Sequence, residues 1–425
     1  MKEEVLHYLW KFQLLDGHLF AADGLPITVI KPGLHNTDSG PDFVDARIQI
    51  GDTMWAGNVE IHIHASSWHD HHHHTDQAYD NVILHVVVDN DRQIKRTDGQ
   101  LIPTLVCDKH INRQFYARYK QLMESRLWVP CVRLIKDCPP FITASWLSTL
   151  MVERLHQKST EMEEVLKNTK YDWEETFYRF VARSLGLKIN TLPFELLASS
   201  LPQKILAKHR DRPLQIEALL FGQAGFLQKD VAEPYPTTLK REYEFLRKKY
   251  NLQPIENSLW KFMRLRPTSF PTVRIAIIAK LMASHALFSK VIESTRAEQL
   301  RQLFNVEVSD YWSDHFRFGI ISKTHRNKKL GVQSVDLLLI NTVIPMLFLF
   351  GRYHGNQDLM DRAIHFLESM PAEENNITRK WTDLGIRISD AATSQALLHL
   401  KKWYCTPKKC LTCRIGNELL RKGSS

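Results

Sequence analysis

The chain has 425 residues, of which 44% are hydrophobic and 24% charged, as in a globular protein with two or three domains. Six cysteines in this length exclude a disulfide-based scaffold and favour a reducing cytoplasm. The net charge of +9 combines −8 in residues 1–100 with +17 in the remaining 325. The basic part of the chain after residue 100 could bind a polyanion, or its excess of positive charge could be spread over a large surface.

No segment predicts secretion or membrane insertion. The N-terminus begins with two acidic residues and has no small-residue cleavage site. The longest apolar stretch, 337–350, is interrupted by Asn341 and Pro345, is shorter than a bilayer span and predicts a buried helix. Because neither segment predicts membrane insertion, we expect no membrane partner. No Walker motif, dinucleotide fingerprint or Ser/His/Asp arrangement is present, so we also expect no nucleotide cofactor.

The first part of the chain predicts mixed α and β structure. A helix is expected over 2–15 and a strand over 26–30. Two alternating strands follow in PDFVDARIQIGDTMWAGNVEIHIH, residues 41–64, with Gly51-Asp52 as the turn. A short helix over 75–81 and a buried strand over 82–88 complete an αβββαβ order. A further hairpin is expected over 93–106, around Asp98-Gly99.

From about residue 139 the apolar period is helical, with proline-containing breaks between segments. Gly222 and Gly225 match no phosphate loop and predict close helix packing. The fold class is therefore α+β, with an α/β domain over 1–135 and a larger all-α domain over 136–425. The expected helices span 146–166, 173–185, 216–227, 239–250, 273–285 and 335–349.

A metal site is predicted on the second strand of the pair. Side chains two apart in a strand share a face, so Glu60, His62 and His64 point the same way. Asp42 begins the preceding strand, and these four residues could hold a divalent cation. The alternative is an exposed strand with a hydrated polar face.

More imidazoles follow in the sequence. His64, His69 and His71–His74 could bind zinc or nickel, or they could form a solvated loop. The spacing Gly57-x4-His62-x-His64 is also similar to the metal-binding strand of a cupin barrel, which is a second alternative.

The C-terminal region contains a cysteine cluster. Cys405, Cys410 and Cys413 have metal-ligand spacing and predict a structural zinc site, unless they are simply reduced thiols. A fourth ligand would be His399, Cys131 or Cys138.

A basic segment interleaved with aromatic residues lies in the helical part. Its arginines could contact phosphates and its phenylalanines could stack on bases, or the arginines could bond neighbouring carbonyls. The candidate nucleic-acid-binding residues are Lys261, Arg264, Arg266 and Arg274.

The αβββαβ order resembles the core of the PD-(D/E)XK nuclease superfamily. The resemblance implies that Asp42 and Glu60 bind Mg²⁺ or Mn²⁺ and that His62 stands where a lysine would activate water. It also implies an additional acid on the first helix, either Glu3 or Glu4. Because a histidine near pH 7 can be a base or a ligand, this departure leaves open altered catalysis or binding without cleavage.

The whole chain is identified as a member of a bacterial family of unknown function, domain-of-unknown-function family 2851. The segments that carry this include SGPDFVDARIQI, WAGNVEIHIHASSWHDH and YCTPKKCLTCRIGNELL. We therefore expect a metal-dependent phosphodiesterase, a hydrolase acting on or recognising DNA or RNA. The alternative is a non-catalytic scaffold, with a degenerate nuclease fold, that binds nucleic acid or protein.

Overall fold

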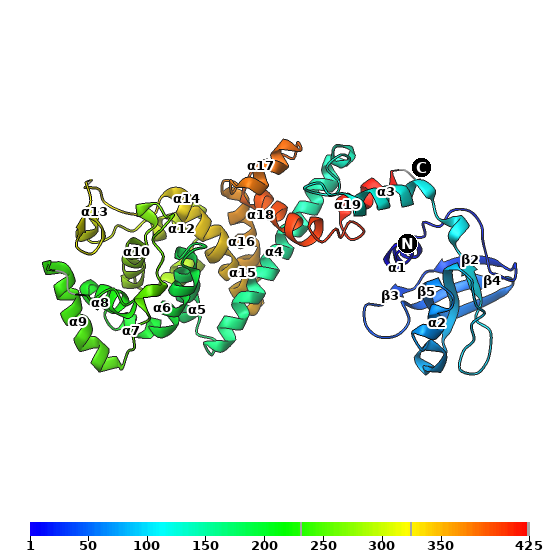
Figure 1. The fold of residues 1–425 in the computed structure, drawn as a ribbon, viewed down its shortest axis with the longest axis horizontal. Helices are drawn as coiled ribbons and strands as arrows, with labels where there is room; N and C mark the ends of the chain where they lie inside the picture. The colour runs from blue at the N-terminus through cyan, green and yellow to red at the C-terminus, as the bar shows by residue number, and fades with distance from the viewer. Residues whose placement is uncertain (230–231, 324, 423–425) are drawn as a thin grey trace. The chain divides into compact units, whose positions relative to one another are not determined.

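The computed structural model describes residues 1–229, 232–323 and 325–422 (Figure 1). The chain divides into two compact units, which are described separately. The first unit comprises Met1–Trp146 together with Lys401–Ser425, and the second comprises Leu147–Leu400. The first segment of this unit thus ends 11 residues beyond the expected boundary at residue 135. The terminal segment, expected in the helical domain, is part of the first unit because its apolar residues join that unit's core.

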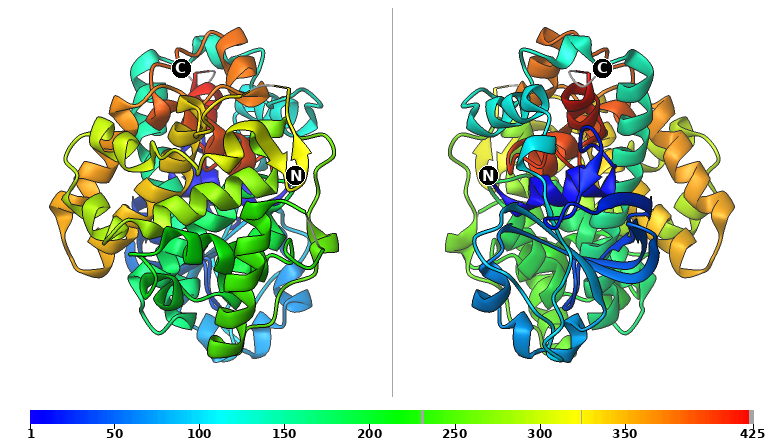
Figure 2. Two further views of the ribbon diagram at one scale, coloured as in Figure 1. Left: turned by 90° about the vertical axis from the view of Figure 1, so that its left-hand side faces the viewer. Right: turned by 90° about the vertical axis from the view of Figure 1, so that its right-hand side faces the viewer.

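The first unit contains a mixed sheet (Figure 2, right, in blue). Strands β1, β2, β4, β5, β6 and β7 lie side by side in that order, and β3 pairs with β4. Pairing is antiparallel from β1 to β5 and parallel for β5–β6 and β6–β7. The strands are β1 Leu19–Phe20, β2 Pro26–Lys31, β3 Leu34–His35, β4 Phe43–Ile50, β5 Thr53–His64, β6 Val82–Asp89 and β7 Thr104–Val106.

The expected strand pair and central strand are confirmed, whereas the hairpin over 93–106 forms only in its inner part. Around Asp98-Gly99 an isolated bridge joins Lys95 and Leu101, and backbone bonds join Arg96 to Gln100 and Ile102 to Ile94. The residues after it form β7, which pairs in parallel with β6. The two parallel pairs also argue against the cupin alternative, because a jelly roll is antiparallel.

Short helices surround the sheet. The first helix, α1 Glu3–Lys11, ends before the expected residue 15, and Gln13 then adopts a left-handed backbone with φ of 51°. The other helical elements of this unit are α2 Ser67–Asp70, η1 His73–Thr75, η2 Gln77–Tyr79, η3 Asp108–His110, α3 Arg113–Glu124, η4 Ile135–Asp137, η8 Lys401–Cys405 and α19 Arg414–Arg421.

The two faces of β5 have different roles. Val59 and Ile61 are buried in a core shared with apolar residues of α1 and α3. Glu60 and His62, which alternate with them, point to the opposite face and are buried as well. A strand with a buried polar face needs partners for its carboxylate and imidazole, because unpaired buried polar groups are costly.

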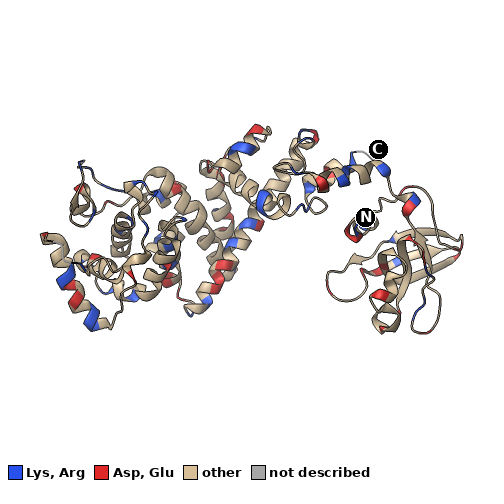
Figure 3. Cartoon of the chain, viewed as in Figure 1, with Lys and Arg blue, Asp and Glu red and all other residues tan. Residues whose placement is uncertain are grey.

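The second unit confirms the expected helical body. Figure 3 shows that α9 carries both Lys or Arg and Asp or Glu along its length. A short hairpin of β8 His315–Arg317 and β9 Ile320–Ile321 was not anticipated. The helices are α4 Pro140–Asn168 (which begins in the first unit), α5 Trp173–Leu185, α6 Thr191–Ser200, α7 Gln203–Ala207, α8 Pro213–Gln223, α9 Pro234–Tyr250, η5 Asn257–Leu259, η6 Pro267–Ser269, α10 Pro271–Ala283, α11 Leu287–Glu293, α12 Ala297–Phe304, α13 Tyr311–Asp314, α14 Val332–Leu338, η7 Leu339–Val343, α15 Ile344–Tyr353, α16 Gln357–Ser369, α17 Asn376–Asp383 and α18 Ala391–Leu400.

One continuous helix, Val332–Tyr353, is long and apolar enough to cross a membrane, and 78% of its most apolar window is buried inside the structure. It contains the π-helical turn η7. There the ammonium of Lys158 donates to the backbone carbonyl of Asn341 at 3.1 Å and to its side-chain oxygen at 2.8 Å. A buried lysine thus provides donors for a carbonyl in the irregular part of this helix.

Close packing at Gly222 brings α8 against α9. A Cβ atom built on Gly222 would lie only 2.1 Å from the Tyr243 ring. The Tyr243 hydroxyl in turn donates to Gln223 at 3.1 Å. Gly225 has φ of +77° and lies in the turn after α8, so this glycine is needed for its backbone conformation as well.

Candidate functional site

Asp42 and Glu60 are held together where β4 begins beside β5. Because Phe43 pairs with Val59, the residues next to them are neighbours across the strands. The Asp42 amide donates to Oε2 of Glu60 at 3.0 Å, and Oδ2 of Asp42 accepts from the Ile61 amide at 3.0 Å. The structure therefore brings together the two carboxylates that the sequence had placed at one site.

Two imidazoles lie beside the Glu60 carboxylate, and a third contacts one of them. Nε2 of His62 and Nε2 of His73 lie 3.5 and 3.2 Å from Oε1 of Glu60. Nε2 of His62 lies 3.2 Å from Nδ1 of His71. His62, His71 and His73 each offer one ring nitrogen within 4.8 Å of the others. We refer to these three histidines and Glu60 as the His/Glu cluster.

The separations within the His/Glu cluster match the edges of a metal coordination shell. An ion bound tetrahedrally at 2.0–2.1 Å places neighbouring ligand atoms about 3.3–3.4 Å apart. Three separations, His62–Glu60, His73–Glu60 and His62–His71, are 3.5, 3.2 and 3.2 Å and lie close to this value. The donor types, imidazole nitrogen and carboxylate oxygen, are ones that bind divalent metal ions.

His85 fixes the orientation of His62. Nδ1 of His62 lies 2.8 Å from Nε2 of His85, which is fully buried on β6. Metal-binding histidines commonly donate their second ring nitrogen to such a partner, which sets the tautomer. Aromatic side chains position His73 in turn. Its ring stacks on the Tyr79 ring, with 3.7 Å between the centroids, and meets the Trp68 ring edge-on.

Burial keeps His62 and His85 neutral. Burial, reinforced by the neighbouring histidines, lowers the pKa of His62 to about 2, and burial lowers the pKa of His85 to about 3. Neutral imidazoles have the free lone pair that a metal ion requires. Burial also raises the pKa of Glu60, despite the opposing effect of His73. A cation would therefore stabilise the ionised form of this carboxylate.

The first helix contributes His7 to the site instead of an acid. Nε2 of His7 lies 3.2 Å from Oδ2 of Asp42. Burial lowers the pKa of His7, but the bond and charge of Asp42, with Glu3 and Glu60, outweigh burial and raise it. Glu4 instead accepts a hydrogen bond from Tyr119 at 2.8 Å. The first helix thus places an imidazole against Asp42, and of the two candidate acids Glu3 acts on His7 through its charge whereas Glu4 bonds to Tyr119.

His64 does not join the His/Glu cluster, although it shares a face with His62. It lies at the end of β5, is more than half exposed and pairs with Asp89 at 3.2 Å. His71 and His73 take its place. They belong to the histidine run, and the sequence offered no means of choosing among its members because they lie outside regular strands.

The three C-terminal cysteines lie near Cys131. Burial, followed by the neighbouring thiols, raises the pKa of Cys131 to about 12, with Cys413 and Cys410 contributing. The pKa of Cys405 is raised by burial and then by Cys131, Cys413 and Cys410. Cys138 has its own hydrogen bond from Thr143. Of the proposed fourth ligands, Cys131 acts on Cys405 and Cys138 acts on Cys413. Among the described residues, however, no three of these thiols form a group with sulfur atoms within 4.8 Å of one another, so the predicted zinc cluster is not assembled.

The predicted basic segment is divided between two environments. The amide of Lys261 donates to Asn190 at 2.9 Å, and Arg264 is exposed with φ of 63°. Arg266 and Arg274 line a cavity in the second unit, where Arg274 is only 5% exposed. The segment therefore does not form one continuous basic surface.

Comparison with known proteins gives one match. The family model described as "Protein of unknown function (DUF2851)" matches residues 3–376. The chain belongs to the DUF2851 family. The matched range includes the His/Glu cluster and the cavity but ends before Cys405. No curated protein and no solved structure matches the chain.

Proposed function

We propose that the first unit is a metal-dependent phosphodiesterase domain that acts on DNA or RNA. The observation that carries the proposal is the meeting of Asp42 and Glu60 beside three imidazoles. Two acids and several imidazole nitrogens in one place form a donor set suited to a divalent ion and to a reaction in which negative charge develops.

The strand order supports the nuclease resemblance. Three antiparallel strands, β2, β4 and β5, are followed by β6, which is parallel to β5, whereas the helix expected over 75–81 is replaced by the short turns η1 and η2. Asp42 immediately precedes the middle strand and Glu60 lies in the third. The His/Glu cluster is the departure, because it supplies nitrogen ligands where the superfamily pattern has a lysine.

The donor set favours a transition-metal ion over Mg²⁺. Magnesium and manganese prefer oxygen ligands, whereas imidazole suits zinc, nickel, iron and copper. A bound ion would lower the pKa of its water and stabilise charge on a scissile phosphate. The second carboxylate oxygen of Asp42 accepts no hydrogen bond from the described residues, and it would hold that water or the ion.

The second candidate function is metal binding without cleavage. The observation that favours it is His62, which is already engaged with His85 and His71 and has a pKa lowered to about 2 by burial. Such an imidazole serves as a ligand and not as a proton carrier near pH 7. In this case the first unit would bind nucleic acid or protein through a surface that the metal ion stabilises, without cleaving it.

The test combines metal binding with cleavage. Purified protein is stripped with chelator and titrated with Zn²⁺, Mn²⁺ and Mg²⁺, and cleavage of single- and double-stranded DNA and RNA is then measured. We expect one transition-metal ion per chain and cleavage that is lost in Glu60→Gln. The exposed His64→Ala variant is the control and should behave as wild type. Equal cleavage by wild type and Glu60→Gln would reject the catalytic assignment, and metal binding without cleavage would select the second candidate.

A further inference from the structure

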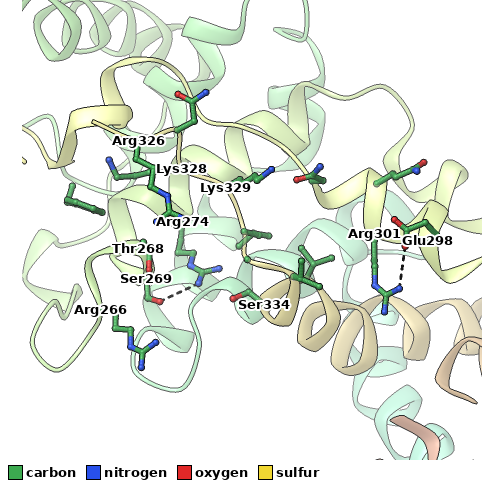
Figure 4. Close-up of a pocket in the computed structure, with 18 residues that line it drawn as sticks. Arg266, Thr268, Ser269, Arg274, Glu298, Arg301, Arg326, Lys328, Lys329 and Ser334 are labelled. Atoms are coloured by element: carbon green, nitrogen blue, oxygen red, sulfur yellow. Dashed lines mark hydrogen bonds and ion pairs between the residues drawn. The ribbon is translucent and has the colours of Figure 1, made fainter. Parts of the chain in front are cut away.

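The second unit contains a large cavity that is separate in sequence from the His/Glu cluster. Its volume is about 870 Å³, within the range of small-molecule sites. Figure 4 shows its side chains coming from η6, α10, α12, the segment before α14, and α14 itself. The residues that the argument uses are Arg266, Arg274, Arg301, Arg326, Lys328 and Lys329.

The charges that line this cavity are strongly unbalanced. Six cationic side chains face one acidic side chain, that of Glu298. Glu298 pairs with Arg301 at 3.4 Å, and Arg301 also binds Asp336 at 2.7 Å. Within the described parts of the chain, the other five cations have no carboxylate at ion-pair distance. The cavity therefore concentrates uncompensated positive charge.

Arg274 is the buried member of this group. It is 5% exposed on α10, and its Nε has no hydrogen-bond partner among the described residues. One terminal nitrogen donates weakly to Ser269 at 3.4 Å, the contact drawn in Figure 4. Burial lowers its pKa to about 10, so the guanidinium remains charged at neutral pH. A buried cation with so few partners is expected where a ligand supplies the missing charge.

Lys328 is the second buried cation. It is 6% exposed, its ammonium donates to the Trp312 carbonyl, and it lies 4.0 Å from the Phe316 ring centroid. These contacts fix its position without neutralising it. Arg266, Arg326 and Lys329 are exposed at the same cavity. Buried and exposed cations are therefore combined at one site.

We propose that this cavity binds a ligand carrying two or more phosphate groups. A guanidinium presents a fork of donors that matches phosphate oxygens, and the lysines add point charges. Hydroxyl groups of Thr268, Ser269 and Ser334 also line the cavity and can donate to phosphate oxygens. Linked phosphates are found in a nucleoside polyphosphate and along a nucleic-acid backbone, and the test distinguishes these sources.

The test uses inorganic tripolyphosphate and the full chain in calorimetric titrations at low salt. We expect binding by wild type and a loss of about tenfold or more in Arg326→Ala/Lys329→Ala, which removes two exposed cations. The matched control is Arg241→Ala/Lys248→Ala, which removes two exposed charges from α9 outside the cavity. Absence of binding by wild type, or an equal loss in the control, would overturn the proposal.

A second variant tests the buried position. Arg274→Met should abolish tripolyphosphate binding while the melting temperature of the ligand-free protein stays the same or rises, because an unpaired buried charge is removed. Arg274→Lys keeps the positive charge but loses the paired donors of the guanidinium group, so this variant should bind tripolyphosphate weakly. If Arg274→Met melts earlier and binds normally, Arg274 is structural and the assignment fails.

The ligand's source is identified by competition. Displacement of tripolyphosphate by a 20-nucleotide single strand would indicate backbone phosphates, and failure to displace it would indicate a small polyphosphate. Either result keeps a phosphate site in the cavity. The inference does not depend on the proposed metal site, because Glu60→Gln should leave tripolyphosphate binding unchanged.

Discussion

Asp42 and Glu60 each use a carboxylate oxygen to bind the backbone of the other's strand. The Asp42 amide bonds to Glu60, and the amide following Glu60 bonds to Asp42, both at 3.0 Å. This reciprocal arrangement fixes Asp42, immediately before β4, against Glu60 on β5. The position of Glu60 against His62 and His73 is thus set by the strand pairing.

The orientation of His62 by His85 predicts an effect on metal affinity. Replacing His85 with Phe removes the partner of Nδ1, and we expect zinc affinity to fall about 10- to 100-fold. His85→Gln keeps a polar group at this position and should retain more of the affinity. Competition with a chromophoric chelator measures the constants. Wild-type affinity in His85→Phe would show that His85 has no such role.

Lys158 predicts a pH dependence of stability in the second unit. Burial lowers its folded-state pKa to about 7, below the unfolded value of 10.5. Between these values the unfolded state binds more protons, so stability rises with pH, by at most about 1.4 kcal/mol per unit. Urea unfolding of wild type and Lys158→Met at pH 7, 8 and 9 isolates this contribution. The stability of wild type relative to the variant should increase over this window, and a constant difference would contradict the prediction.

The cysteine group predicts metal-dependent stability in the first unit. If Cys131, Cys405, Cys410 and Cys413 hold a structural ion, Cys131→Ser should lower bound zinc or iron as measured by elemental analysis. Cys107→Ser, in the sheet core, is the control because this thiol belongs to the apolar cluster. Thiol titration should find the four cysteines protected until chelator is added. If all four thiols of the native protein react before chelator is added, they are reduced thiols that hold no ion.

The contact of Gly222 with Tyr243 predicts a packing defect. A methyl group at Gly222 would overlap the ring, so Gly222→Ala should destabilise the protein by about 1–3 kcal/mol. Gly331→Ala, where a Cβ meets nothing within 4 Å, is the matched control. Thermal unfolding compares the two variants. Similar melting temperatures would mean that α8 and α9 can separate at little cost.

The sequence predicted the parts of the site that lie on strands. Alternation along β5 placed Glu60 and His62 on one face, and the spacing from Asp42 suited two strands and a turn. It did not predict His7, because a helical residue's neighbours depend on how the helix packs. His71 and His73 lie in a run of similar residues, and only the fold distinguishes them.

The burial of Arg274 was equally hidden from the sequence. Its neighbours in the basic segment suggested an exposed surface. Arg274 instead lies on α10, a helix that is apolar on nearly all sides and whose residues are mostly buried. The parallel strand β7 was mistaken for half of a hairpin because Asp98-Gly99 is a good local turn signal. Local turn chemistry could not reveal that the segment after it pairs with a different strand.

The return of Lys401–Ser425 to the first unit has a practical consequence for dissecting the molecule. In chain topology the helical unit is an insertion within the sheet unit, so a fragment ending at Trp146 would lack Cys410 and Leu420 from its own core. Excising 147–400 and joining the flanking ends through a flexible linker is the deletion that keeps that core intact.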